Sequence, residues 1–579
     1  MDSNRSRKIL YVALFLVIAV YLLYSMFGLL APFYWGHHGY HGAIYTLRAR
    51  MSLRLGTIYP YTWSGWEQGP PGALYMHHPI GLHHLLTLTI PIFGDREYMA
   101  RLIGVFSGLF LMFVLWRIGR RLWSNLGGLL AVAAFVSLPF VTAFSVLCDA
   151  MFIEMGCVLL AVDAFLILCE QPSRRALLQA VLANGIGALF MWEVFVASPL
   201  LVLFGFVYRL GKRARTLRLG RLHAFDAYML AVGATLTLLL VLHGYLTWKA
   251  GGLAEMGESY RARSSFPPVI ALVQSQMKWI DAMYGWVPPT VGVLWLAVFC
   301  GRVATRRARL RDVLVILPGL INVIYVGLFP QGTMIHLYRV FFFSGTFIFG
   351  LVDLAHDFGS VARWLVLRRN PKDSNCVAER TSHAAILAVS ALYLFAVIPK
   401  AWANLLESRI NMGTFAVKGY SPQRHKLRFG QEVHRRTTQQ QRAILYYSHL
   451  SARKELWYYV DRTFDEIYAL GEIERFRKNW PISVLMLDSL QISASEQPYY
   501  EDLLRHHPAT FFDGFVMIEL HSNQPGITAY KFVDGPMSLT HRFFVSHHYP
   551  PLLLLPASSG PGVKTAHRLG LPLRTPSGQ

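Results

Sequence analysis

Histidines are concentrated in one polar stretch of this sequence, between residues 37 and 84. His37, His38 and His41 open the stretch, and His77 and His78 stand before a proline near its end. A neutral imidazole can accept a proton as a general base. A helix that begins at such residues also offers N–H groups that favour an anion such as a phosphate. We predict that this stretch is a reaction site, with hydrogen bonding at a membrane interface as the alternative role.

Ionisable residues at the ends of apolar segments are the second signal. Asp149, Glu193 and Arg339 stand at such positions, where a functional role is the default hypothesis. An arginine there suits a lipid phosphate, because its guanidinium donates two parallel hydrogen bonds. Structural pairing is the alternative for each, and it is the interpretation that we favour for Glu154 and Asp163. The predicted catalytic residues are His37, His38, His41, Glu67 and Asp149, and the predicted substrate-binding residues are His77, His78, Glu193, His336 and Arg339.

The composition indicates what kind of protein positions these residues. Of the 579 residues, 54% are hydrophobic and only 15% are charged, whereas a soluble chain carries about a quarter charged residues. Repeated apolar runs of about twenty residues are typical of membrane-spanning helices. The formal charge of +22 is distributed in short clusters between these runs. Such clusters set orientation in a bilayer, so the charge does not indicate a nucleic-acid partner.

We predict a polytopic α-helical membrane protein with about eleven spans. The first covers residues 9–33 and has no clear cleavage site, so we expect it to remain in the mature chain. The others are expected near residues 98–116, 126–144, 147–168, 176–191, 193–208, 225–247, 286–300, 312–329, 337–355 and 383–400.

Alternate connections between these spans are rich in arginine, and such connections belong in the cytoplasm. They fall at residues 117–121, 174–175, 209–221, 302–311 and 363–380. The N-terminus is then cytoplasmic, while the loop of residues 32–97 and everything after Lys400 lie outside the cytoplasmic (inner) membrane. Residues 1–400 form the predicted membrane domain, and its outer loop, 32–97, holds the reaction site.

Residues 401–549 have the composition of a soluble domain. Apolar runs predict strands at 456–462, 482–488 and 515–521, with helices at 464–479 and 498–507. We therefore expect a small extracytoplasmic, or periplasmic, α/β domain, whose simplest role is a structural lid. The end of the chain, 550–579, is rich in Pro, Gly and Ser and is predicted to be disordered.

One combination of motifs resembles a known family. The first span is followed by HHGYHGA and ARMSLRLG within residues 37–56, by YMHHP at residues 75–79 and by GDREYMARLIGVFSG at residues 94–108. This arrangement resembles the GT-C glycosyltransferases. It is most similar to the RgtA/B/C/D-like group, which is related to the protein mannosyltransferases and the aminoarabinose transferases. The resemblance covers roughly residues 10–360.

The resemblance implies transfer of a sugar from a polyprenyl-phosphate carrier to a glycan, lipid or protein acceptor at the outer face of the membrane. It implies catalytic residues in the first outer loop and a later basic residue on the carrier phosphate. The sequence departs from the family at residues 37–41, which lack the acidic residue that much of the superfamily has there. Either a histidine is the base, or Asp149 or Glu67 takes the part of the missing acid, or the chain is a divergent member of the family with altered chemistry.

The reaction that we expect is inverting transfer. A base takes the proton of the acceptor hydroxyl while the oxygen attacks the anomeric carbon, and the carrier phosphate leaves. No cofactor is predicted, and a divalent cation bound at the His-rich loop is the alternative. A non-catalytic membrane assembly protein and a His-dependent metal transporter are the alternatives. The transporter is disfavoured, because it requires ionisable residues near the midplane of several spans.

Overall fold

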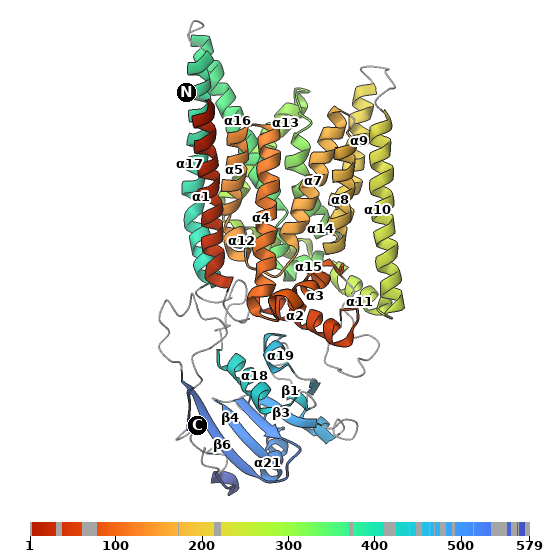
Figure 1. Cartoon of the computed structure of the whole chain (residues 1–579), viewed down its shortest axis with the longest axis vertical. Helices are drawn as coiled ribbons and strands as arrows, with labels where there is room; N and C mark the ends of the chain where they lie inside the picture. The colour runs from red at the N-terminus through yellow and green to blue at the C-terminus, as the bar shows by residue number, and fades with distance from the viewer. Residues whose placement is uncertain are drawn as a thin grey trace. The chain divides into compact units, whose positions relative to one another are not determined.

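The computed structural model describes most of the chain (Figure 1). The described residues are 3–29, 37–60, 78–171, 173–213, 222–369, 375–409, 424–438, 441–446, 454–461, 464–467, 469–474, 482–488, 492–512, 515–533, 553–556, 564 and 567–573. The chain divides into two compact units. The first, here the helical unit, comprises Met1–Gly28, Tyr75–Leu85 and Arg101–Ile410, and the second, here the α/β unit, comprises Leu29–Leu74, Leu86–Ala100 and Asn411–Gln579.

Long apolar helices make up the helical unit, and two of them, α3 and α4, continue into the α/β unit. The helices that follow the chain from its N-terminus are α1 (Ser3–Leu29), α3 (Gly81–Phe93), α4 (Glu97–Leu122), α5 (Asn125–Ser137), α6 (Pro139–Phe144), α7 (Met151–Glu170), α8 (Arg174–Phe190) and α9 (Val194–Arg213). They are followed by α10 (Leu222–Lys249), α11 (Leu253–Ser264), α12 (Val269–Tyr284), α13 (Val287–Ala304), α14 (Asp312–Leu328), α15 (Pro330–Ile335), the 3-10 turn η2 (Leu337–Val340), α16 (Phe343–Arg369) and α17 (Asn375–Arg409).

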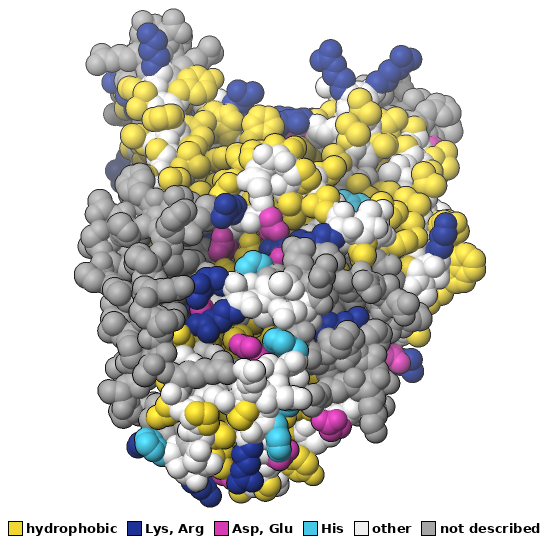
Figure 2. Space-filling model, turned by 60° about the horizontal axis from the view of Figure 1, so that its bottom comes forward, with side chains coloured by type: hydrophobic (Ala, Val, Ile, Leu, Met, Phe, Trp, Pro, Cys, Tyr) yellow, Lys and Arg dark blue, Asp and Glu magenta, His cyan; other side chains and the backbone are white. Residues whose placement is uncertain are grey.

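Several of these helices are suited to a bilayer. Within the described residues, six are long and apolar enough to cross a membrane, and four shorter apolar helices accompany them. Large hydrophobic side chains are exposed on their outer surface, among them Phe15, Leu238 and Phe395, and Figure 2 shows this hydrophobic covering. Exposed apolar area of this extent requires lipid around it. The predicted number of about eleven spans stays a prediction.

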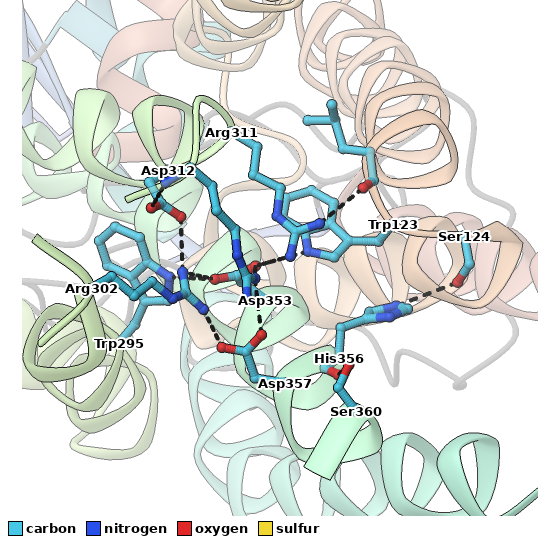
Figure 3. A network of polar contacts seen from close by, with 12 residues as sticks. Trp123, Ser124, Trp295, Arg302, Arg311, Asp312, Asp353, His356, Asp357 and Ser360 are labelled. Carbon is cyan, nitrogen blue, oxygen red and sulfur yellow. Dashed lines mark hydrogen bonds and ion pairs between the residues drawn. The ribbon is translucent and has the colours of Figure 1, made fainter. Parts of the chain in front are cut away.

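A buried ion-pair network ties α13, α14 and α16 together (Figure 3). The fully buried Asp353 accepts hydrogen bonds from the indole nitrogens of Trp123 and Trp295 at 3.0 and 3.1 Å. Arg302 and Arg311 lie 2.6 and 3.0 Å from its two oxygens. A buried carboxylate without such partners is strongly destabilising, so these four donors identify Asp353 as a structural group. The arginines of the predicted 302–311 connection are therefore partly neutralised within the fold.

The α/β unit contains a mixed sheet with strand order β2-β1-β3-β5-β4-β6-β7 among the described residues. β1 pairs in parallel with β2 and β3, and β4 with β6, whereas the β3–β5, β4–β5 and β6–β7 pairs are antiparallel. The elements are α2 (His37–Leu55), α18 (Arg424–Arg436), β1 (Arg442–Tyr446), α19 (Lys454–Val460), β2 (Phe464–Ile467), η3 (Leu470–Glu472), β3 (Ile482–Asp488), α21 (Gln497–His506), β4 (Pro508–Phe512), β5 (Phe515–Glu519), β6 (Gly526–Val533) and β7 (Leu553–Pro556).

The two faces of this sheet carry separate cores, as the alternation of side chains along a strand requires. Ile444 and Leu485 pack with Leu504 of α21 on one face. Ala443 and Val484 pack on the other face, with residues of α18 and α19 and with Leu47 of α2. The α/β unit is therefore three-layered, and the helix of the predicted reaction loop is part of it.

Three expectations for the last part of the chain differ from the structure. Residues 456–462 were expected to form a strand, but most of them lie in α19, whereas the expected helix at 464–479 begins with strand β2. Short apolar runs do not distinguish a buried helix from a strand, which explains both errors. The expected disordered tail, 550–579, contains β7, which pairs with β6, and a bridge from Leu573 to Ile527.

Candidate active site

The turn between α6 and α7 positions Asp149. Its Oδ1 accepts the backbone N–H of Met151 at 3.2 Å, which orients the carboxylate at the start of α7. Gly104 of α4 lies against this turn so closely that a Cβ there would be 2.5 Å from the carbonyl oxygen of Leu147. Glycine is therefore needed for α4 to approach. Asp149 is 5% exposed, and both it and Arg101 interact electrostatically with the buried Cys148.

Glu193 occupies the tight turn between α8 and α9, where the sequence places it. Its backbone oxygen accepts the N–H of Ala197 at 2.9 Å, so the turn leads directly into α9. The start of α3 packs against the end of α8 through Gly81, where a Cβ would be 2.4 Å from the carbonyl oxygen of Leu189. This close approach holds the segment that begins at His78 near the Glu193 turn.

Arg339 lies in η2, before α16, and not inside a continuous span over 337–355 as expected. Side chains of α12 provide the hydrogen bonds that allow this break. Trp279 Nε1 donates to the Met334 oxygen at 3.2 Å, and the hydroxyl of Tyr284 donates to the Val340 oxygen at 2.9 Å. Irregular backbone at membrane depth requires such buried partners.

Arg339 pairs with Glu193 in a buried site. Its Nη1 donates to Glu193 Oε1 at 3.0 Å, and its Cζ lies 5.3 Å from the centre of the Tyr325 ring. The two charged side chains are only 7% and 2% exposed. This is the structural pairing that the sequence analysis left as the alternative for Arg339. It does not exclude a ligand, because a guanidinium has five N–H donors.

Glu154 belongs to the same site, and its structural role stays a prediction. It is fully buried in the first turn of α7 and interacts electrostatically with Glu193, Arg339 and Asp149. Its carboxyl group shares a hydrogen bond with that of Glu193. Asp163, by contrast, is paired as expected, with Arg121 at 2.6 Å. Asp149, Glu154, Glu193 and Arg339 are hereafter the acid–arginine cluster.

The acid–arginine cluster combines the groups that acid–base chemistry needs. It brings together three carboxyl groups and one guanidinium from segments that are far apart in the sequence, 149–154, 193 and 339. A buried carboxylate can accept a proton from a hydroxyl group. The guanidinium can stabilise a developing anion in a site from which water is excluded.

A second basic pair lies on the same unit. Arg263 Nη1 of α11 is 3.4 Å from His78 Nε2, and Arg263 also interacts electrostatically with Tyr325, as Arg339 and Glu193 do. His336 is the residue that ends α15, and its carbonyl oxygen accepts the N–H of Arg339 at 3.0 Å. We did not predict Arg263 from the sequence, although it lies in the connection between the predicted spans 225–247 and 286–300, where an arginine was a usable signal. Nor did we predict Arg101 and Tyr325.

An apolar groove adjoins the Glu193 turn. Its empty volume, including the open side, is about 360 Å³. The end of α8, residues of α9 and α10 and the Pro79–Ile80 segment line it, and Trp192 stands beside the ring of His243 at 5.1 Å between centres. Because Trp192 directly precedes Glu193, the groove lies beside the turn that carries Glu193.

Comparison with known proteins finds one matching family model and solved structures of similar fold. The family model described as dolichyl-phosphate-mannose-protein mannosyltransferase matches residues 77–242. The apo oligosaccharyltransferase of Archaeoglobus fulgidus matches with a TM-score of 0.52 at 10% identity, covering 86% of this chain and 73% of that one. The chain has the GT-C fold. Apo ArnT from Cupriavidus metallidurans has a TM-score of 0.50 at 13% identity, covering 87% of this chain and 97% of that one. No curated protein sequence matches the chain.

The match supports the expected class of protein. With six candidate spans among its described helices and the GT-C fold, the chain is a multi-pass membrane protein. The matched residues, 77–242, contain Asp149, Glu154 and Glu193. Arg339 and the helix at 37–55 lie outside that range.

The structure describes only some of the residues that we predicted in the first outer loop. The backbone of His37 and His38 begins α2, and His41 is buried, with the Tyr45 ring centre 5.8 Å from its own. Glu67 and His77 lie outside the described residues. Two arginines of α2, Arg48 and Arg50, are buried.

The possible divalent-cation site in the His-rich loop stays a prediction. Where side chains are described, no group of three or more His, Cys, Asp or Glu residues is arranged to hold a metal ion.

Proposed function

We propose that the chain transfers a sugar from a polyprenyl-phosphate carrier to a cell-envelope acceptor at the outer face of the cytoplasmic membrane. The acid–arginine cluster carries this proposal, because it provides both a buried base and a buried cation within a GT-C fold. The description of the matching family, a dolichyl-phosphate-mannose-protein mannosyltransferase, supports a lipid-linked donor. The acceptor is a glycan, a lipid or a protein.

Asp149 is the base that we favour within the cluster. It is the most exposed of the three acidic residues, at 5% of the whole residue against 1% for Glu193 and none for Glu154, so it is the one that we expect an acceptor hydroxyl to reach. The hydroxyl oxygen forms a bond to the anomeric carbon while the bond from that carbon to the phosphate oxygen breaks. The proton passes to the base, and the phosphate leaves as an anion. His38 is the base that we propose if Asp149 serves only to orient the acceptor.

The leaving phosphate needs cations, and the lipid chain needs an apolar surface. Arg339 provides one guanidinium, and the Arg263–His78 pair provides a second basic site. Charge-assisted contacts of this kind stabilise the anion as it forms. The groove beside Trp192 is lined largely by apolar residues and offers the carrier chain a place next to these groups.

Turnover of a lipid-linked donor by the purified chain tests this function. In lipid nanodiscs with synthetic polyprenyl-phosphate sugars, we expect release of polyprenyl phosphate with one of the sugars, and inversion at its anomeric carbon. The measurement is product mass and anomeric configuration after incubation. If folded protein consumed no polyprenyl-phosphate sugar in the presence of membrane glycan, lipid and protein acceptors, the proposed function would be wrong.

The orientation of the chain is also a proposal, based on its arginine-rich connections. We expect cysteines introduced at Ser421 and Ser538 to react with an impermeant reagent from outside, and one at Ser3 to react only after the membrane is opened. The native Cys300 is exposed, so a cysteine-free background is required. Labelling of Ser421→Cys and Ser538→Cys only in opened membranes would contradict the outer location of the site.

A further inference from the structure

Two arginines of α2 meet one carboxylate at the end of α19. Arg54 Nη1 and Nη2 donate to the two oxygens of Asp461 at 2.8 and 2.7 Å. Arg50 Nη1 donates to Oδ1 of the same residue at 2.7 Å. Asp461 is thus held by three N–H donors, two of them in the parallel geometry that gives an arginine–carboxylate pair its strength and direction.

Arg50 connects this contact to a third segment. Its Nε donates to Asp95, and its guanidinium carbon lies 4.5 Å from the centre of the Tyr458 ring. The neighbouring Tyr459 donates its hydroxyl to Glu97 at 2.9 Å. The motifs ARMSLRLG and GDREYMARL, which the sequence analysis singled out, therefore meet each other at α19. All of these residues belong to the α/β unit.

The backbone at Asp461 is adapted to this contact. Asp461 ends α19 in the left-handed region, with φ of 44°, and its N–H donates to the Trp457 oxygen at 3.0 Å. Asp and Asn are the non-glycine residues that adopt this conformation most readily. A carboxylate at this position can therefore point at α2 with little strain.

The electrostatics show that the contact is made between charged groups. Burial opposes the charged forms, but the hydrogen bonds of Arg54 and the charge of Arg50 hold the pKa of Asp461 below its ordinary value. Burial likewise opposes the charge of Arg50, while Asp95 and Asp461 raise its pKa. With side-chain exposures of 10% for Arg50 and 16% for Asp461, the pair is buried enough to matter more than a surface ion pair.

We propose that Asp461 is a positioning residue for the transfer reaction, because it fixes the helix α2 that carries His37, His38 and His41. The C-terminal domain then holds the helix of the predicted reaction loop in place and is not a detached lid. The effect on catalysis rests on the proposed function, whereas the fixing of α2 does not. Misplacing a catalytic helix by about 1 Å is sufficient to slow a reaction by about a hundredfold.

Asp461→Asn tests the proposal, because asparagine keeps the backbone conformation and removes the charge. We expect amide hydrogen exchange in α2 to accelerate by about tenfold or more, since local opening becomes easier. We expect kcat for sugar transfer to fall by about 10- to 100-fold with KM for the lipid donor unchanged. The matched control is Asp502→Asn, whose side chain is 67% exposed in the same domain, and it should change neither quantity.

A double variant separates positioning from simple loss of stability. Because Arg54 and Asp461 act through each other, Arg54→Gln combined with Asp461→Asn should be no slower than the slower single variant. Additive losses would overturn the coupling. Unchanged exchange in α2 would show that Asp461 does not hold the helix, and faster exchange with an unchanged kcat would show that its position is not needed. A wild-type chain that turns over no lipid-linked sugar would overturn the catalytic part, while hydrogen exchange would still report on the Asp461 contact.

Discussion

Asp149→Asn is expected to reduce sugar transfer by about 10²- to 10⁴-fold at normal expression and thermal stability. The variant keeps the shape of the side chain and its place at the start of α7, but the amide cannot take the proton of the acceptor hydroxyl. General-base catalysis is worth about that factor. The measurement is initial rate with a saturating lipid-linked donor, across a range of acceptor concentrations.

Matched variants show whether this effect belongs to catalysis. Asp281→Asn, on the helix α12 that supports the 330–340 segment, should leave the rate unchanged. His38→Ala tests the alternative base, and Glu67→Gln tests an acid from later in the first loop. If both Asp149→Asn and His38→Ala kept near wild-type turnover, our assignment of the base would be wrong, and Glu154→Gln would be the next variant to measure.

Arg339→Ala is expected to destabilise the helical unit by about 3–5 kcal/mol, the usual effect of removing one partner of a buried ion pair. The remaining Glu193 carboxylate would then face Glu154 without its guanidinium, in a site from which water is largely excluded. Thermal unfolding in nanodiscs measures this loss. Because the buried charge causes it, Arg339→Met combined with Glu193→Gln should recover most of the stability.

The folded double variant then isolates any role of Arg339 toward the carrier phosphate. A charge-assisted contact contributes about 1.5–3 kcal/mol, so its loss should raise the apparent KM for the lipid donor by about one to two decades. Arg339→Lys should show an intermediate effect, since it keeps the charge without the two-pronged geometry. A double variant with wild-type KM would make Arg339 a purely structural partner of Glu193, and the phosphate site would have to be sought at Arg263 and His78.

These expectations depend on two different sources of information. Length, hydropathy and the spacing of charges determined that the chain is a multi-pass helical protein, because a bilayer excludes unpaired polar backbone from its core. The same spacing indicated Asp149, Glu193 and Arg339 as candidate site residues, because each stands where an apolar segment ends. These properties depend only on residues that are close together in the sequence, so they can be predicted without a structure.

Only the tertiary structure decided which of these groups meet. Arg339 pairs with Glu193 across 146 positions of sequence, and Arg50 reaches Asp461 across 411. The buried Glu154 joins the cluster through Glu193 and Arg339, which are distant from it in the sequence. Residues 456–460 lie in helix α19, whose Leu456, Trp457 and Val460 pack in one core with residues of α18 and of the sheet. Such contacts depend on which sides of two helices or strands pack against each other. That packing is established only when the chain folds.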